Sequence, residues 1–127
     1  MLSGKYRAGQ AADPGTRAGR RDKRMLEAEW RPESLVIAER LTVHAAERGT
    51  NLVGWACAWL LNNRAVSSII AGPRTFDQWT SYFAALDYEW TAEDEKLADS
   101  LVAPGHASTP GFTDPAYPVE GRFPRVG

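Results

Sequence analysis

The strongest constraint on this chain is a short apolar run, residues 66–71, that leads directly into a helix start. Such a run is typical of a buried strand, and Gly72 after it lets a ligand approach the backbone closely. Thr75 and Gln78 have the spacing of a capping box, which predicts a helix N-terminus at this point. Helix N-termini present free N–H groups and Arg74 adds a full charge, so the junction can hold an anion. By itself so short a motif favours the plainer interpretation, a capped helix beside a solvated Arg74.

Helical patterns come before this strand. From Glu33 to Arg48 one face is apolar and the rest is charged, which predicts an amphipathic helix closed by Gly49. The apolar face carries Ile37, Ala38, Leu41 and Ala45. We expect Thr50 to cap a second helix, from Leu52 to Leu61, that is apolar on most sides and therefore covered on most sides.

Two more helices are expected after the strand. Aromatic and aliphatic residues recur there at helical spacing, and we interpret this stripe as core rather than as a ligand site. The stripe consists of Phe76, Trp79, Phe83 and Leu86. Thr91 and Asp94 have capping-box spacing, which predicts a last helix through Leu101. The fold class is therefore α/β but mainly helical, with one clear strand (about 66–71) and four main helices.

The two ends of the chain differ in composition from its middle. Residues 1–32 are rich in glycine and charge, and they predict a long loop segment with one short helix near Lys23 to Trp30. Residues 104–127 carry five prolines, too many for a continued helix, and we expect this tail to fray. We therefore divide the chain into a loop segment (1–32), a helical portion (33–103) and a Pro-rich tail (104–127).

Composition narrows the classes of partner. Fifteen basic and sixteen acidic residues give a net charge of −1, which disfavours nucleic acid and anionic membranes as partners. No run approaches 18 apolar residues and no leader segment is evident, so we expect neither a membrane span nor secretion, and a cytoplasmic location. Cys57 is the only cysteine, and His44 and His106 lack metal-ligand spacing, so we expect no disulfide and no metal site. We interpret Cys57 as an inert core thiol.

Several stretches, taken in order, resemble the C-terminal part of the aldo/keto reductases, and the resemblance covers nearly the whole chain. They are Leu2–Tyr6, Ala58–Leu61, Ile69–Gln78, Ala84–Leu86 and Trp90–Asp94. The resemblance implies that the chain is the C-terminal fragment of a (β/α)8 TIM barrel. Such a barrel takes about 250 residues, so roughly half of it is absent from these 127.

The resemblance also implies a reaction and a limit on it. The family transfers a hydride from NADPH to an aldehyde or ketone, and its catalytic Asp, Tyr, Lys and His lie on earlier strands. This chain lacks them, so the resemblance implies no catalytic residue here and no activity of the chain alone. Partners would be the missing N-terminal half of the barrel or a second copy of the chain. The alternative is a small helical protein–protein interaction module without enzyme activity, because a lone strand and uncovered helix faces favour association.

By resemblance, the cofactor-binding residues are Lys5, Arg17, Gly72, Arg74, Gln78, Ser81 and Tyr82. Lys5 and Arg17 match positions near the cofactor phosphates. Arg74 would face the 2′-phosphate, which favours NADPH over NADH. Ser81 and Tyr82 stand where many relatives have a Glu–Asn pair that holds the adenosine. For Tyr82, stacking on adenine and a place in the core both remain open, and the core is favoured.

Overall fold

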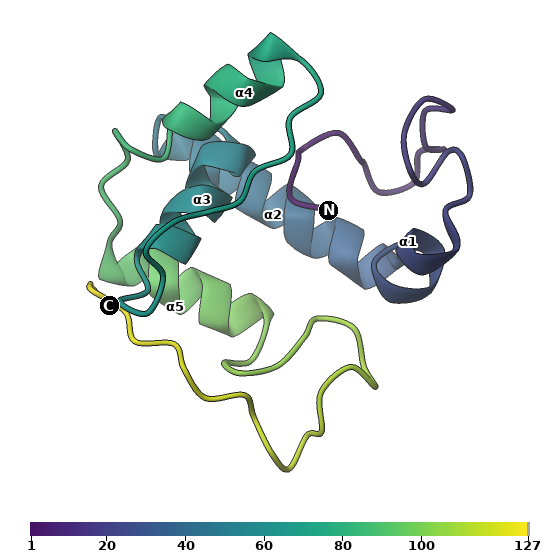
Figure 1. The fold of residues 1–127 in the computed structure, drawn as a ribbon. Coiled ribbons are helices and arrows are strands. Elements are labelled where there is room, and N and C mark those ends of the chain that lie inside the picture. Colours follow the sequence, from purple (N-terminus) through teal and green to yellow (C-terminus); the bar gives the residue numbers. More distant parts are fainter. Residues whose placement is uncertain (127) are drawn as a thin grey trace.

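The computed structural model describes residues 1–126, and this part of the chain folds into five α-helices (Figure 1). They are α1 (Lys23–Ala28), α2 (Pro32–Glu47), α3 (Leu52–Leu61), α4 (Phe76–Phe83) and α5 (Ala92–Leu101). Helix α3 lies between α4 on one side and α5 on the other, and α2 runs past it (Figure 1). The four main helices and the short helix near Lys23 are confirmed. None of the described helices is long and apolar enough to cross a membrane.

Helix α2 buries the face that its sequence predicts. Pro32 stands in its first turn, where a missing N–H costs nothing. The buried residues of α2 include Leu35, Ala38, Leu41 and Ala45. Gly49 follows the helix with a φ of 76°, a left-handed conformation that suits glycine and reverses the chain into α3.

Helix α3 has the predicted bounds, but its N-cap lies one residue later than the sequence predicts. The side chain of Asn51 accepts a hydrogen bond of 2.8 Å from the amide of Gly54 and forms the N-cap. The expected cap, Thr50, instead donates its own amide to the carbonyl of Ala45, at 2.9 Å. Thr50 therefore closes the turn between α2 and α3 rather than capping α3.

The main core lies where α2, α3 and the 84–91 link meet. Its buried residues are Leu41, Ala45, Leu52, Trp55, Cys57, Ala58, Ala85 and Trp90. The rings of Trp55 and Trp90 are 4.9 Å apart, centroid to centroid, so two large side chains fill the centre of this cluster. Cys57 is buried among them, as expected of an inert core thiol, and burial raises the pKa of its thiol.

The strand expected over residues 66–71 does not form. This segment is extended but pairs with no other strand, and the described residues contain only an isolated antiparallel bridge, between Asn63 and Pro124. Ile69 packs against the main core, whereas Ile70 is fully exposed (101%). The physical reason is that a strand exists only when a neighbour satisfies its backbone, and residues 1–126 offer none. No sheet or barrel is present in this part of the chain.

The prediction of a core role for the aromatic stripe of α4 is also wrong. Phe76 is 79% exposed, Leu86 is 70% exposed, and Trp79 and Phe83 are close to half exposed. Helix α4 contains no buried residue. It meets the core only through its C-terminal end, where Tyr82 and Ala85 pack inward. The amphipathic pattern correctly marked an apolar face, but nothing among the described residues covers that face.

The N-terminal segment folds around a small core of its own. Tyr6, Ala18 and Met25 are buried there with Leu35 from the start of α2. The rings of Tyr6 and Trp30 meet edge to face at 5.2 Å. Residues 1–32 are thus mostly loop, as expected, but they have a packed centre.

The tail does not fray as its composition predicted. The guanidinium of Arg122 donates two hydrogen bonds of 2.6 Å to the carboxylate of Glu95 in α5, and another of 2.9 Å to the carbonyl of Trp59. The side chain of Asn62 donates to the carbonyl of Val126 at 2.8 Å. These contacts return the tail to the end of α3, and they were not predicted because no local pattern encodes them.

We expect Gly54→Ala to destabilise the protein, because a Cβ there would lie 2.8 Å from the Cβ of Ala84 and 2.9 Å from Oγ1 of Thr50. Overpacking costs about 1–3 kcal/mol, against about 1 kcal/mol gained from helix preference, so we expect a net loss of up to about 2 kcal/mol in the free energy of unfolding. Urea denaturation measures this.

The matched control is Gly72→Ala, whose new Cβ meets no atom within 4 Å. It should leave the free energy of unfolding unchanged or raise it by less than about 1 kcal/mol. If Gly54→Ala has the same free energy of unfolding as the wild type, the close approach of α3 to Ala84 is contradicted.

Candidate functional site

The candidate anion site begins at the N-cap of α4, where Thr75 is the cap, as predicted. Its hydroxyl accepts a hydrogen bond of 3.2 Å from the amide of Gln78. The Gln78 side chain does not complete a capping box on Thr75. Its Oε1 accepts instead from the amide of Arg74, at 2.8 Å. Gln78 therefore fixes the backbone just before the helix and is already engaged.

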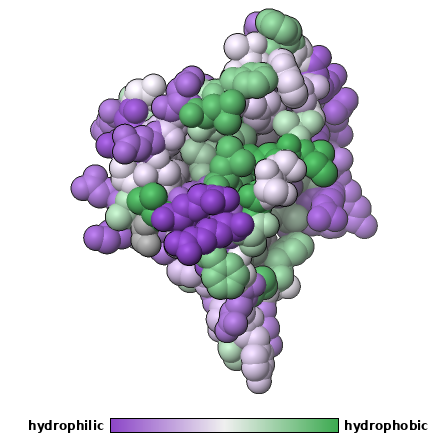
Figure 2. All heavy atoms as spheres, turned by 60° about the vertical axis from the view of Figure 1, so that its left-hand side comes forward, coloured by the Kyte–Doolittle hydropathy of each residue, from purple (hydrophilic) through white to green (hydrophobic). Residues whose placement is uncertain are grey.

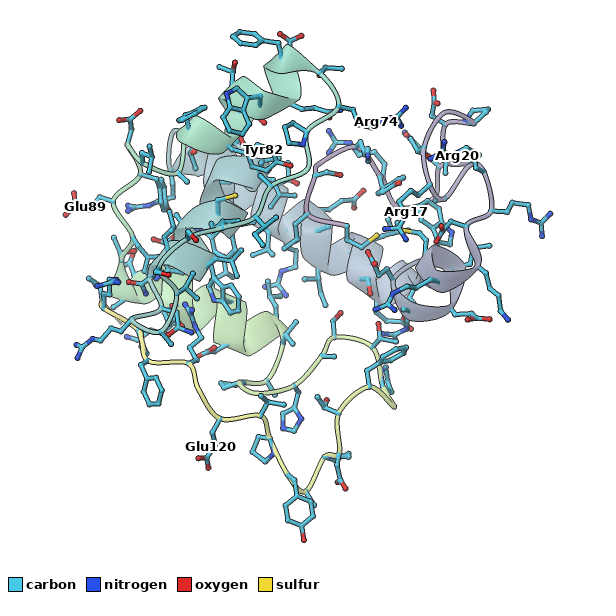
Figure 3. The ribbon with its side chains drawn as sticks, in the orientation of Figure 1. Arg17, Arg20, Arg74, Tyr82, Glu89 and Glu120 are labelled. Atoms are coloured by element: carbon cyan, nitrogen blue, oxygen red, sulfur yellow. The ribbon has the colours of Figure 1, made fainter. Side chains whose placement is uncertain are left out.

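Three backbone amides at this helix start remain open. Those of Thr75, Phe76 and Asp77 donate to no acceptor within residues 1–126, and all three residues are exposed. Arg74 is exposed beside them (Figure 3). Free amides and a guanidinium suit a phosphate group. Asp77 works against this, because its carboxylate already complements the partial positive charge of the first turn.

The remaining residues of the junction have local roles. Gly72 is exposed, and a Cβ built on it would meet nothing within 4 Å, so packing does not require glycine there. The hydroxyl of Ser81 donates to the carbonyl of Gln78, at 2.7 Å within α4. Tyr82, on α4 (Figure 3), is half-buried and packs against the main core.

Lys5 and Arg17 lie on the N-terminal segment, away from α4 in sequence, and no hydrogen bond or ion pair in the described part of the chain joins them to it. The ammonium of Lys5 lies 5.6 Å from the ring centre of Tyr6. The guanidinium of Arg17 donates to Asp22 at 3.0 Å, and this hydrogen bond raises its pKa. Asp22 is also the N-cap of α1. Five of the seven candidates therefore share the junction, and the other two sit on a separate segment.

A second cluster of polar side chains surrounds Asp94, which has no exposed surface. One carboxylate oxygen accepts hydrogen bonds from three side chains, and the other accepts from the hydroxyl and amide of Thr91. The three donors are His44 Nε2 at 2.6 Å, Tyr88 Oη at 2.7 Å and Trp55 Nε1 at 2.9 Å. The expected capping box of Thr91 and Asp94 is confirmed.

The acidity of Asp94 follows from these bonds. Burial alone would raise the pKa of this carboxyl, but hydrogen bonds from His44, Tyr88, Trp55 and Thr91 outweigh it and hold the pKa well below its usual range. A buried carboxylate whose oxygens are fully engaged has no atom left for a substrate. The cluster is therefore a structural one, and it does not supply a general base.

Sequence reasoning missed most of this cluster, and it missed Glu95 as the anchor of Arg122. His44 and Asp94 are 50 residues apart, and Glu95 and Arg122 are 27 apart. Neither pair can be recognised from a sequence motif, because its two residues lie far apart in the chain. Among residues 1–126, no three His, Cys, Asp or Glu side chains are placed to hold a metal ion.

Comparisons of the chain with protein-family models, with curated proteins and with solved structures found no match. The functional argument therefore rests on the residues and on their geometry.

We expect the protein to lose stability in acid through Asp94. Because folding lowers its pKa, its contribution is complete above the unfolded value, near 4, and is lost as the pH falls below it. Asp94→Asn should reduce the free energy of unfolding at pH 7 by about 3 kcal/mol or more, since several donors lose their acceptor. It should also flatten the dependence of stability on pH between 5 and 3, measured by denaturation at each pH.

The matched control is Asp87→Asn, which changes an exposed carboxyl in the link between α4 and α5. This variant should keep the wild-type stability and most of its acid dependence. An Asp94→Asn protein as stable as the wild type at pH 7, or equally sensitive to acid, would show that the cluster contributes little.

Proposed function

We propose that this chain is the C-terminal part of an NADPH-dependent aldo/keto reductase, which holds the adenosine phosphate end of the cofactor and leaves the chemistry to the N-terminal part of the barrel. The parent reaction is hydride transfer to an aldehyde or ketone. The chain alone carries out no reduction, because it contains none of the residues that the family uses for catalysis.

The observation that carries the proposal is the extended, unpaired segment 66–71 between two helices. Helix, extended segment and helix follow one another here as they do in a βα barrel from which the neighbouring strands have been removed. Ile69 faces the helices, and Ile70 points to solvent on the other side. A strand between a helical layer and a barrel interior needs two apolar faces, and this segment has both.

The cofactor part of the proposal rests on the end of that segment. Phosphate sites of such barrels use the loop after the last strand and a helix N-terminus. Here Arg74 and the open amides of Phe76 and Asp77 supply a planar cation and donors at one place. Arg74 is then the residue that distinguishes the 2′-phosphate of NADPH from the hydroxyl of NADH.

We expect the chain to bind NADP+ more tightly than NAD+ in calorimetric titration. Arg74→Ala should weaken NADP+ binding about tenfold or more, since a hydrogen bond to a charged group contributes about 1.5–3 kcal/mol. The control Arg40→Ala removes another exposed arginine, on α2, and should change nothing. Absence of NADP+ binding by the folded chain, or equal affinity for the two cofactors, would contradict the proposal. So would turnover of aldehydes with NADPH above the buffer blank.

A second candidate function is a helical interaction module, and the exposed stripe on α4 favours it. Phe76, Trp79, Phe83 and Leu86 leave an apolar strip on one helix, and the rings of Trp79 and Phe83 touch edge to face at 5.3 Å. Figure 2 shows hydrophobic side chains gathered in the upper part of one face, where α4 lies. Contiguous apolar patches of this kind mark protein-binding surfaces.

We expect the α4 stripe to drive self-association in the absence of another partner. Sedimentation and light scattering should give a mass that rises with protein concentration, and Trp79→Ser should shift the chain toward monomer. The control is Phe112→Ser, which changes an aromatic residue of the tail that is 58% exposed. A concentration-independent monomer, or an equal response to both substitutions, would count against the interaction module.

A further inference from the structure

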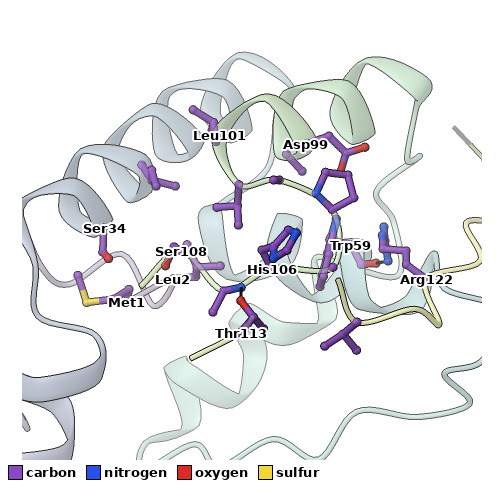
Figure 4. A pocket seen from close by; sticks show the side chains of 18 of the residues that line it. Met1, Leu2, Ser34, Trp59, Asp99, Leu101, His106, Ser108, Thr113 and Arg122 are labelled. Carbon is purple, nitrogen blue, oxygen red and sulfur yellow. Dashed lines mark hydrogen bonds between the residues drawn. The ribbon is translucent and has the colours of Figure 1, made fainter. Parts of the chain in front are cut away.

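A cavity of about 700 Å³ opens between the helices and the tail, on the other side of α3 from α4 (Figure 4). Its size falls within the range of small-molecule sites, about 300–1,000 Å³. Helices α2, α3 and α5 form one wall, and the tail segment 103–122 forms the other. None of the seven candidate cofactor residues lines it.

The wall of this cavity is mostly apolar. Its larger hydrophobic side chains are Ile37, Leu41, Trp55, Leu101, Val102 and Val119. Ser34 lies at one end of the cavity and Trp59 at the other, with His106 between them (Figure 4). A ligand that fills this space is therefore elongated and mainly apolar, with polar positions available at its two ends.

Both end residues carry a polar atom without a partner. Within residues 1–126, the Oγ of Ser34 and the Nε1 of Trp59 are buried and make no hydrogen bond. More than nine in ten buried polar groups in proteins are paired, so two unpaired atoms beside one cavity are unusual. The indole N–H can only donate, so the missing partner of Trp59 is an acceptor.

The charges around the cavity favour a neutral ligand. Arg122 is the only lysine or arginine in its described lining, and its Nε and Nη2 atoms are both bonded to Glu95 at 2.6 Å. The same guanidinium stacks over the Trp59 ring at 4.0 Å. The acidic side chains of Asp99 and Glu120 also border the cavity. The N-terminal ammonium of Met1 lines the cavity too, but it lies 3.5 Å from the carboxylate of Glu29. Among the described residues, an anion would therefore meet acidic groups and no unpaired cation.

We propose that this cavity binds a neutral, mainly apolar small molecule whose oxygen accepts a hydrogen bond from Trp59 Nε1. Both unpaired atoms are buried, so the ligand reaches them through a small shift of the loops that line the cavity. These loops belong mostly to the tail, which has no helix or paired strand of its own beyond the bridge at Pro124. The site is independent of the proposed cofactor site.

Two probes with the same skeleton test the proposal: benzophenone, which has an acceptor oxygen, and diphenylmethane, which has none. In ¹⁵N–¹H spectra, benzophenone should move the Trp59 indole resonance downfield with saturation, whereas diphenylmethane should bind more weakly and cause no such shift. Trp59→Phe identifies the resonance by its loss. This substitution keeps a ring beneath Arg122 and removes no hydrogen bond, so the variant is expected to fold.

Trp59→Phe should weaken benzophenone binding about fivefold and leave diphenylmethane binding unchanged, since one neutral hydrogen bond contributes about 1 kcal/mol. The matched control, Trp79→Phe, changes an indole on α4 outside the cavity and should bind both probes as the wild type does. If neither probe shows saturable binding to the folded chain, the cavity holds only water and the proposal is overturned. Equal binding of the two probes also overturns it.

Discussion

The arrangement of the helices depends on one buried carboxylate. Asp94 has no exposed surface, yet it stays ionised, and a buried charge is tolerated only when its oxygens are fully engaged. Its donors come from α2 (His44), α3 (Trp55), the link before α5 (Tyr88) and the α5 cap (Thr91). A shift of any one of these elements would remove one of the hydrogen bonds to the carboxylate. The cluster thus fixes the relative positions of three helices at a single point, next to the packed rings of Trp55 and Trp90.

Residues 1–126 form no sheet, and they divide into a part whose apolar faces are covered and a part whose apolar faces are not. Helices α2, α3 and α5 meet around the main core and the Asp94 cluster, so their apolar faces are satisfied by one another. Segment 66–86 is covered much less. Within it, Ile69 and the side chains at the end of α4 pack against the main core. Its remaining apolar groups, Ile70 and the α4 stripe, therefore face solvent. Nothing among residues 1–126 covers segment 66–71 on its outer side or the α4 stripe, so these surfaces are the ones available to a partner.

The sequence predicted what residues within one helical turn decide. The caps at Thr75 and Thr91 and the buried face of α2 follow from spacings of three or four residues, and the structure has them. Periodicity marked the apolar face of α4 correctly, but it carries no information on whether a partner exists to cover that face. The junction at Arg74 was found because its residues are contiguous. The bond from His44 to Asp94 spans 50 residues and has no local signature, so no reading of spacing could have found it.

The return of the tail explains how the cavity beside Trp55 persists. Protein interiors are packed nearly as densely as organic crystals, so loops around a space of this size tend to close over it unless other contacts hold them open. Arg122 provides such contacts, because its guanidinium spans Glu95 of α5, the Trp59 carbonyl of α3 and the face of the Trp59 ring. These bonds pair the guanidinium with a carboxylate, and they hold the C-terminal end of the tail against α3 and α5. The loops between α5 and Arg122 line the cavity without filling it. Arg122 therefore both holds the tail in place and leaves the cavity without an unpaired guanidinium, which suits a neutral, apolar ligand.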